Sequence, residues 1–237
     1  MDSGNIGFVL LCAAFVFVMT PGLAMFYGGL VRKKNVVNTM MTSIFIIGVG
    51  IVMWVLFGYS LSFAPSGNVF IGDFRWLGLE GVSLTEGYTD DASIPNMVFS
   101  AFQMMFAVIT PALITGAVAG RMKFKSIFVF TIFWSLIVYY PLAHMVWGQG
   151  GLLGADGIGA LDFAGGDVVH ISSGVSALVL SILLGKRHDY EHSIYRIHNI
   201  PTVVLGASLL MFGWFGFNAG SALAADGLAA HAFMTTG

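Results

Sequence analysis

One histidine in this sequence stands where ionisable side chains are rarely found. His170 lies in DVVHISSGVSALVLSILLGKR, an apolar run that ends at a Lys-Arg pair, as a membrane helix does at a surface. An ionisable group inside a membrane is costly, so His170 is a candidate functional residue by default. A neutral imidazole offers one donor and one acceptor nitrogen, which suits contact with a small ligand or a proton. The alternative is a histidine whose hydrogen bonds are satisfied inside a packed core.

An aspartate precedes this histidine by eight residues. Eight helical residues rise about 12 Å, so Asp162 and His170 cannot share one small site along a straight helix. A carboxylate near a helix N-terminus is stabilised by the dipole and by free backbone donors. Asp162 is therefore either a cap or a functional acid, and the sequence leaves both readings open. The small residues at 172–176 are expected to leave room beside the ring of His170.

Aromatic and polar side chains stand near the ends of three other apolar runs. Phe102 and Phe106 are four residues apart, so they share one face of a helix. Trp147 follows the run PLAHMV, and Ser221 follows the aromatic run GWFGF. A single interfacial tryptophan is usually part of an aromatic belt, so Trp147 taken alone does not indicate a site.

The elements that must position these residues are membrane helices. Of 237 residues, 57% are hydrophobic and only 9% are charged, whereas soluble domains average about 25% charged. Because about 20 apolar residues cross a bilayer as a helix, each uncharged stretch can hold one span. A further span is expected to begin near Leu228. The prediction is an all-α polytopic bundle with six spans within 4–31, 35–72, 92–120, 126–155, 168–185 and 197–225.

Basic residues set the expected orientation. Nine of the ten Lys and Arg residues fall in the first, third and fifth connections, which lie on one side. That side should be cytoplasmic. The connection 65–95 holds five acidic residues against Arg75 and is expected outside, together with the N-terminus. The start MDSGNIG lacks a basic n-region, so no cleaved signal peptide is expected. The predicted location is the cytoplasmic membrane, with multiple passes.

Composition also argues against several other classes. A net charge of −2 disfavours a nucleic-acid partner. A single cysteine, Cys12, excludes an internal disulfide. His188 and His192 have helical spacing for a metal, with Glu191 between them, but the order is not HExxH and no third ligand is evident. We expect no enzyme activity, no metal and no cofactor.

Five blocks of the sequence together resemble the ammonium transporter family (Amt/Mep/Rh), and specifically its Amt branch. DFAGGDVVHISSG is the most specific of them. The other four are TPGLAMFYGGLVRKKNVVNTMM, AFQMMFAVITPALITGAVAGRMKF, PLAHMVWGQGG and GWFGFNAGSAL. The resemblance implies a homotrimer of eleven-helix protomers, in which ten helices form two inverted repeats. Residues 1–237 would be the N-terminal portion of this domain, with the first repeat at about 5–186 and the start of the second at 197–237. A truncated chain with six of the eleven helices is therefore expected.

The resemblance also implies roles for individual residues. Phe106, Trp147 and Ser221 resemble an outer recruitment site for ammonium. This site lies in the outer vestibule of the family fold. Asp162 resembles an acidic residue beside the vestibule, without direct contact to the ligand.

Below the vestibule, the resemblance implies a pore. Phe102 and Phe217 resemble aromatic elements in or near it, and Phe106 with Phe217 resembles a stacked gate. His170 resembles the first of two paired pore histidines, the second of which lies in a later helix of the family.

The function that follows from the resemblance is ammonium transport. The cation would be captured at the aromatic vestibule and deprotonated, and ammonia would pass a hydrophobic, histidine-lined pore. The expected partners are ammonium or ammonia, the lipid bilayer, further copies of the chain and a cytoplasmic regulator of the PII type. The alternatives are an ammonium sensor of the same fold and an Rh-type channel for neutral gases.

Overall fold

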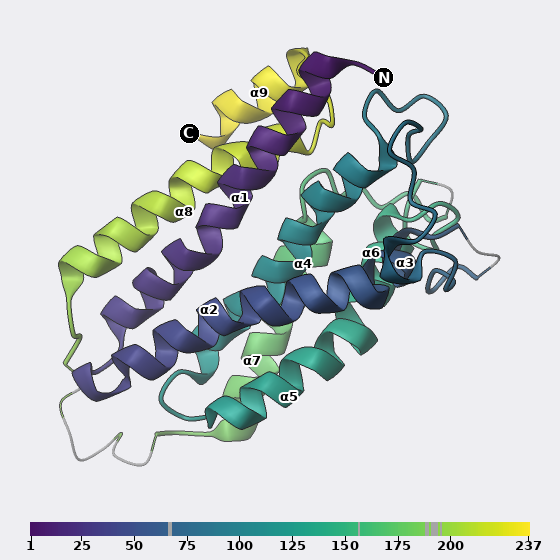
Figure 1. The fold of residues 1–237 in the computed structure, drawn as a ribbon. Coiled ribbons are helices and arrows are strands. Elements are labelled where there is room, and N and C mark those ends of the chain that lie inside the picture. The colour runs from purple at the N-terminus through teal and green to yellow at the C-terminus, as the bar shows by residue number, and fades with distance from the viewer. Residues whose placement is uncertain (66–67, 156, 188–189, 191–193, 195) are drawn as a thin grey trace.

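The structure is a computed structural model that describes residues 1–65, 68–155, 157–187, 190, 194 and 196–237. Within these residues all regular secondary structure is helical, and six helices are long and apolar enough to cross a membrane (Figure 1). The spans are Ser3–Leu30, Lys33–Phe63, Asn96–Val118, Phe124–Trp147, Gly166–Leu184 and Ile200–Gly220. The all-α prediction is confirmed, and each observed span falls at a predicted stretch.

Three of the spans are composite, because each contains a π-helical turn. The second joins η1 (Lys33–Asn35), α2 (Val36–Met53), the π turn η2 (Trp54–Gly58) and α3 (Tyr59–Phe63). The fourth joins α5 (Phe124–Trp134), the π turn η4 (Ser135–Tyr139) and α6 (Tyr140–Trp147). The fifth begins with the π turn η5 (Gly166–Ile171) and continues as α7 (Ser172–Leu184). The remaining elements are α1 (Ser3–Leu30), η3 (Leu77–Leu79), α4 (Asn96–Val118), α8 (Ile200–Gly220) and α9 (Gly227–Thr236).

Helix α4 is the most buried span, and α1, α2 and α7 pack around it. Helices α1 and α8 run antiparallel in close contact (Figure 1). Glycines permit this approach: a Cβ on Gly206 would lie 2.3 Å from the backbone nitrogen of Phe26. Small residues have this role in membrane helices because association there depends on packing. The close pairing carries the C-terminal end of α8 to the outer end of α4.

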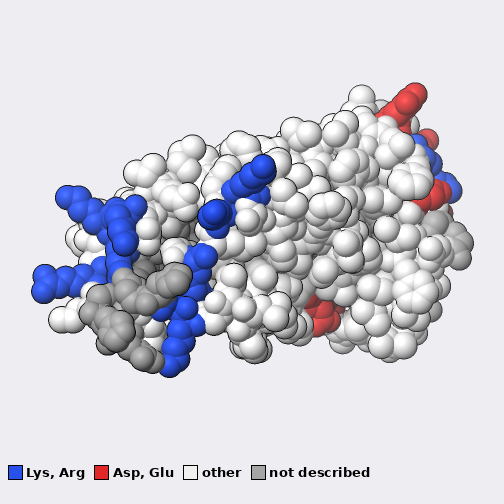
Figure 2. Space-filling view, turned by 90° about the horizontal axis from the view of Figure 1, so that it is seen from below, with Lys and Arg blue, Asp and Glu red and all other residues white. Residues whose placement is uncertain are grey.

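Charges are segregated along the molecule. Lys and Arg gather mainly towards one end, and Asp and Glu mainly towards the other (Figure 2). The basic end is the one that the positive-inside rule assigns to the cytoplasm. In the acidic connection, Arg75 pairs with Asp73 at 2.6 Å. The hydrogen bond from Arg75 lowers the pKa of Asp73. With its single base paired, the segment 65–95 keeps a net negative charge.

The acidic connection is anchored on the outer ends of the helices. The Tyr88 ring stacks on Phe99 of α4, with centroids 4.8 Å apart. Gln149 donates its backbone N–H to the Tyr88 hydroxyl at 3.0 Å and its side-chain amide to the Tyr88 carbonyl at 2.9 Å. The imidazole of buried His144 lies within 3.2 Å of the Ser62 carbonyl and 3.0 Å of the Asn68 carbonyl. These contacts hold the connection in place as a wall over α4.

Candidate functional site

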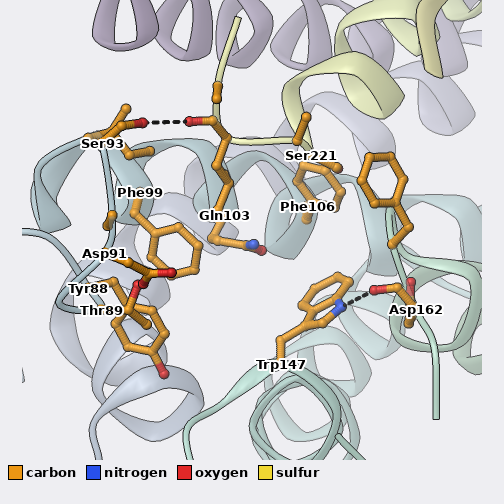
Figure 3. Close-up of a pocket in the computed structure, with 16 residues that line it drawn as sticks. Tyr88, Thr89, Asp91, Ser93, Phe99, Gln103, Phe106, Trp147, Asp162 and Ser221 are labelled. Atoms are coloured by element: carbon orange, nitrogen blue, oxygen red, sulfur yellow. Dashed lines mark hydrogen bonds between the residues drawn. The ribbon is translucent and has the colours of Figure 1, made fainter. Parts of the chain in front are cut away.

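A cavity of about 410 Å³ lies at the outer end of the bundle (Figure 3). One face of α4 lines it with Phe99, Gln103 and Phe106, which are spaced i, i+4 and i+7. Trp147 lines it from the end of α6, and Ser221 from the residue after α8. The segment 88–94 covers it from the outer connection. The structure thus brings together the three residues predicted for the recruitment site.

The orientation of Trp147 is fixed by a hydrogen bond. Its indole N–H donates to the backbone carbonyl of Asp162 at 2.9 Å. The ring stands edge-on to Phe106, with centroids 6.1 Å apart and an interplanar angle of 86°. Because the only donor of the indole is used, the ring contributes only its π surface and apolar edge to the cavity.

The carboxylate of Asp162 caps the fifth span. One oxygen accepts the backbone N–H groups of Gly165 at 2.5 Å and Gly166 at 2.8 Å. The other accepts those of Asp167 at 2.8 Å and Val168 at 2.9 Å. Gly165 is the residue before the helix, and the other three donors belong to its first turn, where backbone N–H groups have no partner within the helix. Of the two readings that the sequence left open, this geometry supports the cap.

Ser221 presents an acceptor to the cavity. Its hydroxyl donates to the Phe217 carbonyl one turn earlier, at 2.9 Å. The proton is therefore committed to the backbone, whereas the oxygen retains lone pairs that can accept a hydrogen bond. A ligand that brings its own N–H groups suits this arrangement better than one that needs a donor.

An aromatic pair closes the inner side of the cavity. The rings of Phe106 and Phe217 lie 4.2 Å apart at 31°, and each side chain is 1% exposed. Phe102 packs on Phe106 at 4.9 Å but lines neither this cavity nor the one beyond it. A Cβ on Gly220 would lie 2.6 Å from the Phe102 ring. Phe102 therefore supports the pair from behind.

His170 lies beyond the aromatic pair, outside the cavity of Trp147 and Ser221. Its ring stacks on Trp214 at 5.4 Å and 24°, and lies 5.9 Å from Phe217. It is exposed on its other side and lines a second cavity of about 390 Å³, with Trp214, Asn218 and Thr235 among the other lining residues. Asp162 borders both cavities.

Of the small residues at 172–176, Gly174 lies one turn after His170, and a Cβ at that position would meet open space. Ser172 and Ser173 are buried, and their hydroxyls donate to carbonyls of their own helix at 2.5 and 2.6 Å. Two and three positions along a helix correspond to about 200° and 300° of rotation. These serines therefore point to other faces, while the imidazole meets the aromatic side chains of α8.

Several lining residues escaped sequence reasoning. Trp214 stands three residues before Phe217 on α8, a spacing that could have indicated its contact with His170. Gln103 is a single amide between Phe102 and Phe106, and its position in an apolar span was an available signal. Tyr88 had none, because only the folding of the outer connection brings it to α4. Burial raises the pKa of the Tyr88 phenol to about 12, against the opposing effect of the Gln149 N–H. The phenol is therefore neutral at physiological pH.

The structure also bears on the clustering of side chains that bind metals. In the part of the chain that the structure describes, no group of three or more His, Cys, Asp or Glu side chains is placed to hold a metal ion. The pair of His188 and His192, with Glu191 between them, lies outside the described residues.

Comparison with known proteins gives consistent results. A model of the Ammonium Transporter Family matches residues 7–237. An ammonium transporter of Bacillus subtilis is 52% identical over 236 residues, which cover 100% of this chain and 57% of the relative. An ammonium transporter of Mycobacterium tuberculosis is 45% identical over 255 residues, which cover 99% of this chain and 54% of the relative.

Among solved structures, Mep2 of Candida albicans matches with a TM-score of 0.87 at 34% identity, covering 98% of this chain and 51% of that one. A sensor Amt protein matches with a TM-score of 0.81 at 28% identity, covering 96% and 56%. The chain spans about half the length of the curated relatives that it matches.

Proposed function

The chain belongs to the ammonium transporter family, and from that premise we propose that it acts in moving ammonium nitrogen across the cytoplasmic membrane. The cavity at Trp147 captures the ammonium ion from outside. The pair formed by Phe106 and Phe217 separates this vestibule from the pore in which His170 stands.

The observation that supports this proposal is the polarity of the cavity. The Trp147 N–H and the Ser221 hydroxyl proton are both committed to backbone carbonyls. Of these two residues, an aromatic face and a hydroxyl oxygen remain, and both attract a cation that carries N–H donors. A cation over an aromatic face gains about 0.5–2 kcal/mol, more when it is desolvated. A neutral gas would gain little from this arrangement, so we favour ammonium over the Rh-type alternative.

The closed aromatic pair gives the next step of the proposal. An unsolvated ion is very costly in a dry apolar passage, so ammonium gives up a proton before its nitrogen passes Phe106 and Phe217. Ammonia then meets the imidazole of His170, which offers a hydrogen-bond partner on the inner side. If the proton follows through the pore, transport is electrogenic, and if it returns outside, transport is passive; a current distinguishes the two.

Transport is also the better supported of the two family functions. The relative that is 52% identical is an ammonium transporter, whereas the sensor Amt protein is 28% identical. Two further proposals come from the family resemblance alone. The protein assembles as a homotrimer, and its cytoplasmic side binds a regulator of the PII type.

The test is uptake of methylammonium by cells that express the natural gene containing this sequence, together with ammonium-induced current in proteoliposomes. Ser221→Ala removes one charge-assisted hydrogen bond, worth about 1.5–3 kcal/mol. The substrate concentration at half-saturation should therefore rise about tenfold or more. Ser208→Ala is the matched control, since Ser208 on α8 makes the same bond to the carbonyl four residues earlier but is exposed away from the cavity. Equal behaviour of the two variants would contradict the proposed recruitment site.

Trp147→Leu provides a second test, because it removes the aromatic face but keeps an apolar side chain. Half-saturation for ammonium should rise about five- to thirtyfold, the equivalent of 1–2 kcal/mol of cation–π attraction. Absence of any ammonium-dependent uptake or current in the unmodified protein would overturn transport itself.

A further inference from the structure

Gln103 is the least explained polar residue of the vestibule. It lies on α4 between Phe99 and Phe106 on the cavity face and is 8% exposed. Its side-chain oxygen is buried and accepts no hydrogen bond. Among the described side-chain atoms that are buried without a partner, this one alone belongs to a residue that lines the cavity. An unsatisfied buried acceptor costs about 1–3 kcal/mol, so it calls for a reason.

Gln103 does not fit the usual role of a polar residue in a membrane helix, which is to bond to a neighbouring helix. Other buried polar groups of α4 do so: Ser100 accepts from the indole of Trp54, and Thr115 bonds to Ser43 at 3.2 Å. The Gln103 amide instead points into the space between the segment around Tyr88 and the Trp147 ring (Figure 3).

We propose that the side-chain oxygen of Gln103 is a second hydrogen-bond acceptor for ammonium in the vestibule. The inference rests on the proposed function of the cavity. The two ends of an amide differ little in size, and a half-turn about its last torsion exchanges them. In one orientation the amide turns its N–H₂ towards a cation, and in the other its oxygen. The unpartnered oxygen gains a donor only in the second, so the bound ion selects that orientation.

The resulting site matches the shape of ammonium. The ion has four N–H donors in tetrahedral directions. Ser221 at the end of α8 takes one, Gln103 on α4 takes another, and aromatic faces or water receive the rest. A potassium ion has no N–H to direct at a π surface and would exchange its hydration shell for two oxygens. Gln103 thus adds discrimination as well as affinity. An amine with a single N–H cannot use both oxygens at once.

The experiment compares three variants in the protein expressed from its natural gene. Gln103→Met keeps the length of the side chain without an acceptor, and Gln103→Glu keeps an acceptor and adds charge. Met104→Leu, one position along α4 and outside the cavity lining, is the matched control. The readouts are half-saturation of the ammonium-induced current, its inhibition by potassium, and the thermal stability of the purified protein.

We expect Gln103→Met to raise half-saturation for ammonium about tenfold or more, as for one lost bond to a charged group. The potassium concentration that gives half-maximal inhibition should change less than about threefold. Gln103→Glu should bind ammonium at least as tightly as the unmodified protein, and Met104→Leu should behave like it.

Half-saturation within about threefold of the original in Gln103→Met would overturn the inference. Equal weakening of ammonium binding in Gln103→Met and Gln103→Glu, together with equal loss of thermal stability, would also overturn it and indicate a structural role. If Ser221→Ala weakens binding while Gln103→Met does not, the proposed function stands and only this inference fails. If the unmodified protein gives no ammonium-dependent current, both fail.

Discussion

Replacing Asp162 by asparagine separates a capping role from a charge role for this residue. The carboxylate accepts four backbone N–H groups at the start of the fifth span, from Gly165, Gly166, Asp167 and Val168. The single carbonyl oxygen of an asparagine can accept at most two of them. Its amide nitrogen would face the other two donors.

The expected loss of folding stability in Asp162→Asn follows from the two backbone donors that lose their acceptor. Each costs about 1–3 kcal/mol when it is buried. The lower end of this range, about 1 kcal/mol for each donor, applies because the site is partly exposed and water can reach Gly166. A loss of about 2 kcal/mol corresponds to a fall in Tm of about 4–8 °C for a chain of this size. The carbonyl of Asp162 also holds the Trp147 indole, so loosening this turn should weaken ammonium capture as well.

The assay combines thermal unfolding of the purified protein with uptake of methylammonium. Asp162→Asn should lower both together. Asp162→Glu keeps the charge but adds a methylene, so it should also be impaired if geometry matters. Asp167→Asn is the control, since only the backbone of Asp167 takes part in the cap. Lost uptake at an unchanged Tm in Asp162→Asn, together with full activity in Asp162→Glu, would refute the capping account.

Three further predictions concern other contacts. His144→Phe should lower the free energy of unfolding by about 1–3 kcal/mol, because a buried hydrogen bond that anchors the outer connection is lost; an unchanged denaturation midpoint would exclude that anchor. Gly220→Ala should cost about 1–3 kcal/mol, since its Cβ would lie 2.6 Å from the Phe102 ring, and the companion change Phe102→Leu should recover part of this loss in the same unfolding measurement. Asp91→Asn removes a carboxylate from the cavity mouth and should raise half-saturation a few-fold at low salt; at about 1 M salt the Debye length is about 3 Å and the difference should disappear. A salt-independent effect of Asp91→Asn would indicate direct contact instead.

Local features of the sequence were enough to predict the helices. Uncharged stretches of sufficient length marked all six spans, and π turns such as Trp54–Gly58 left their overall limits unchanged. The shared face of Phe102 and Phe106 followed from the helical period, and the rings do pack at 4.9 Å. The same period sorts the residues that follow His170. Gly174 lies one turn along, beside open space, whereas Ser172 and Ser173 point to other faces, because adjacent helical positions differ in direction by about 100°.

For Asp162, the sequence supplied the residue but not the choice between its two roles. Four converging N–H groups depend on the turn at Gly165, which has a left-handed backbone with φ of 98°. Glycine adopts that conformation without steric cost. The cap is therefore a product of local conformation that only coordinates can display.

Sequence alone thus determined the membrane class, the six spans, the segregation of charge and, through resemblance, the family. Tertiary structure decided which residues meet. Phe106, Trp147 and Ser221 come from three different helix regions, and the close glycine contacts between α1 and α8 help to bring the last of them to the cavity. The same packing set Gln103 inside that cavity with an unpaired oxygen. Hydropathy depends on single residues and their neighbours along the chain, whereas a binding site depends on distances between segments that only packing fixes.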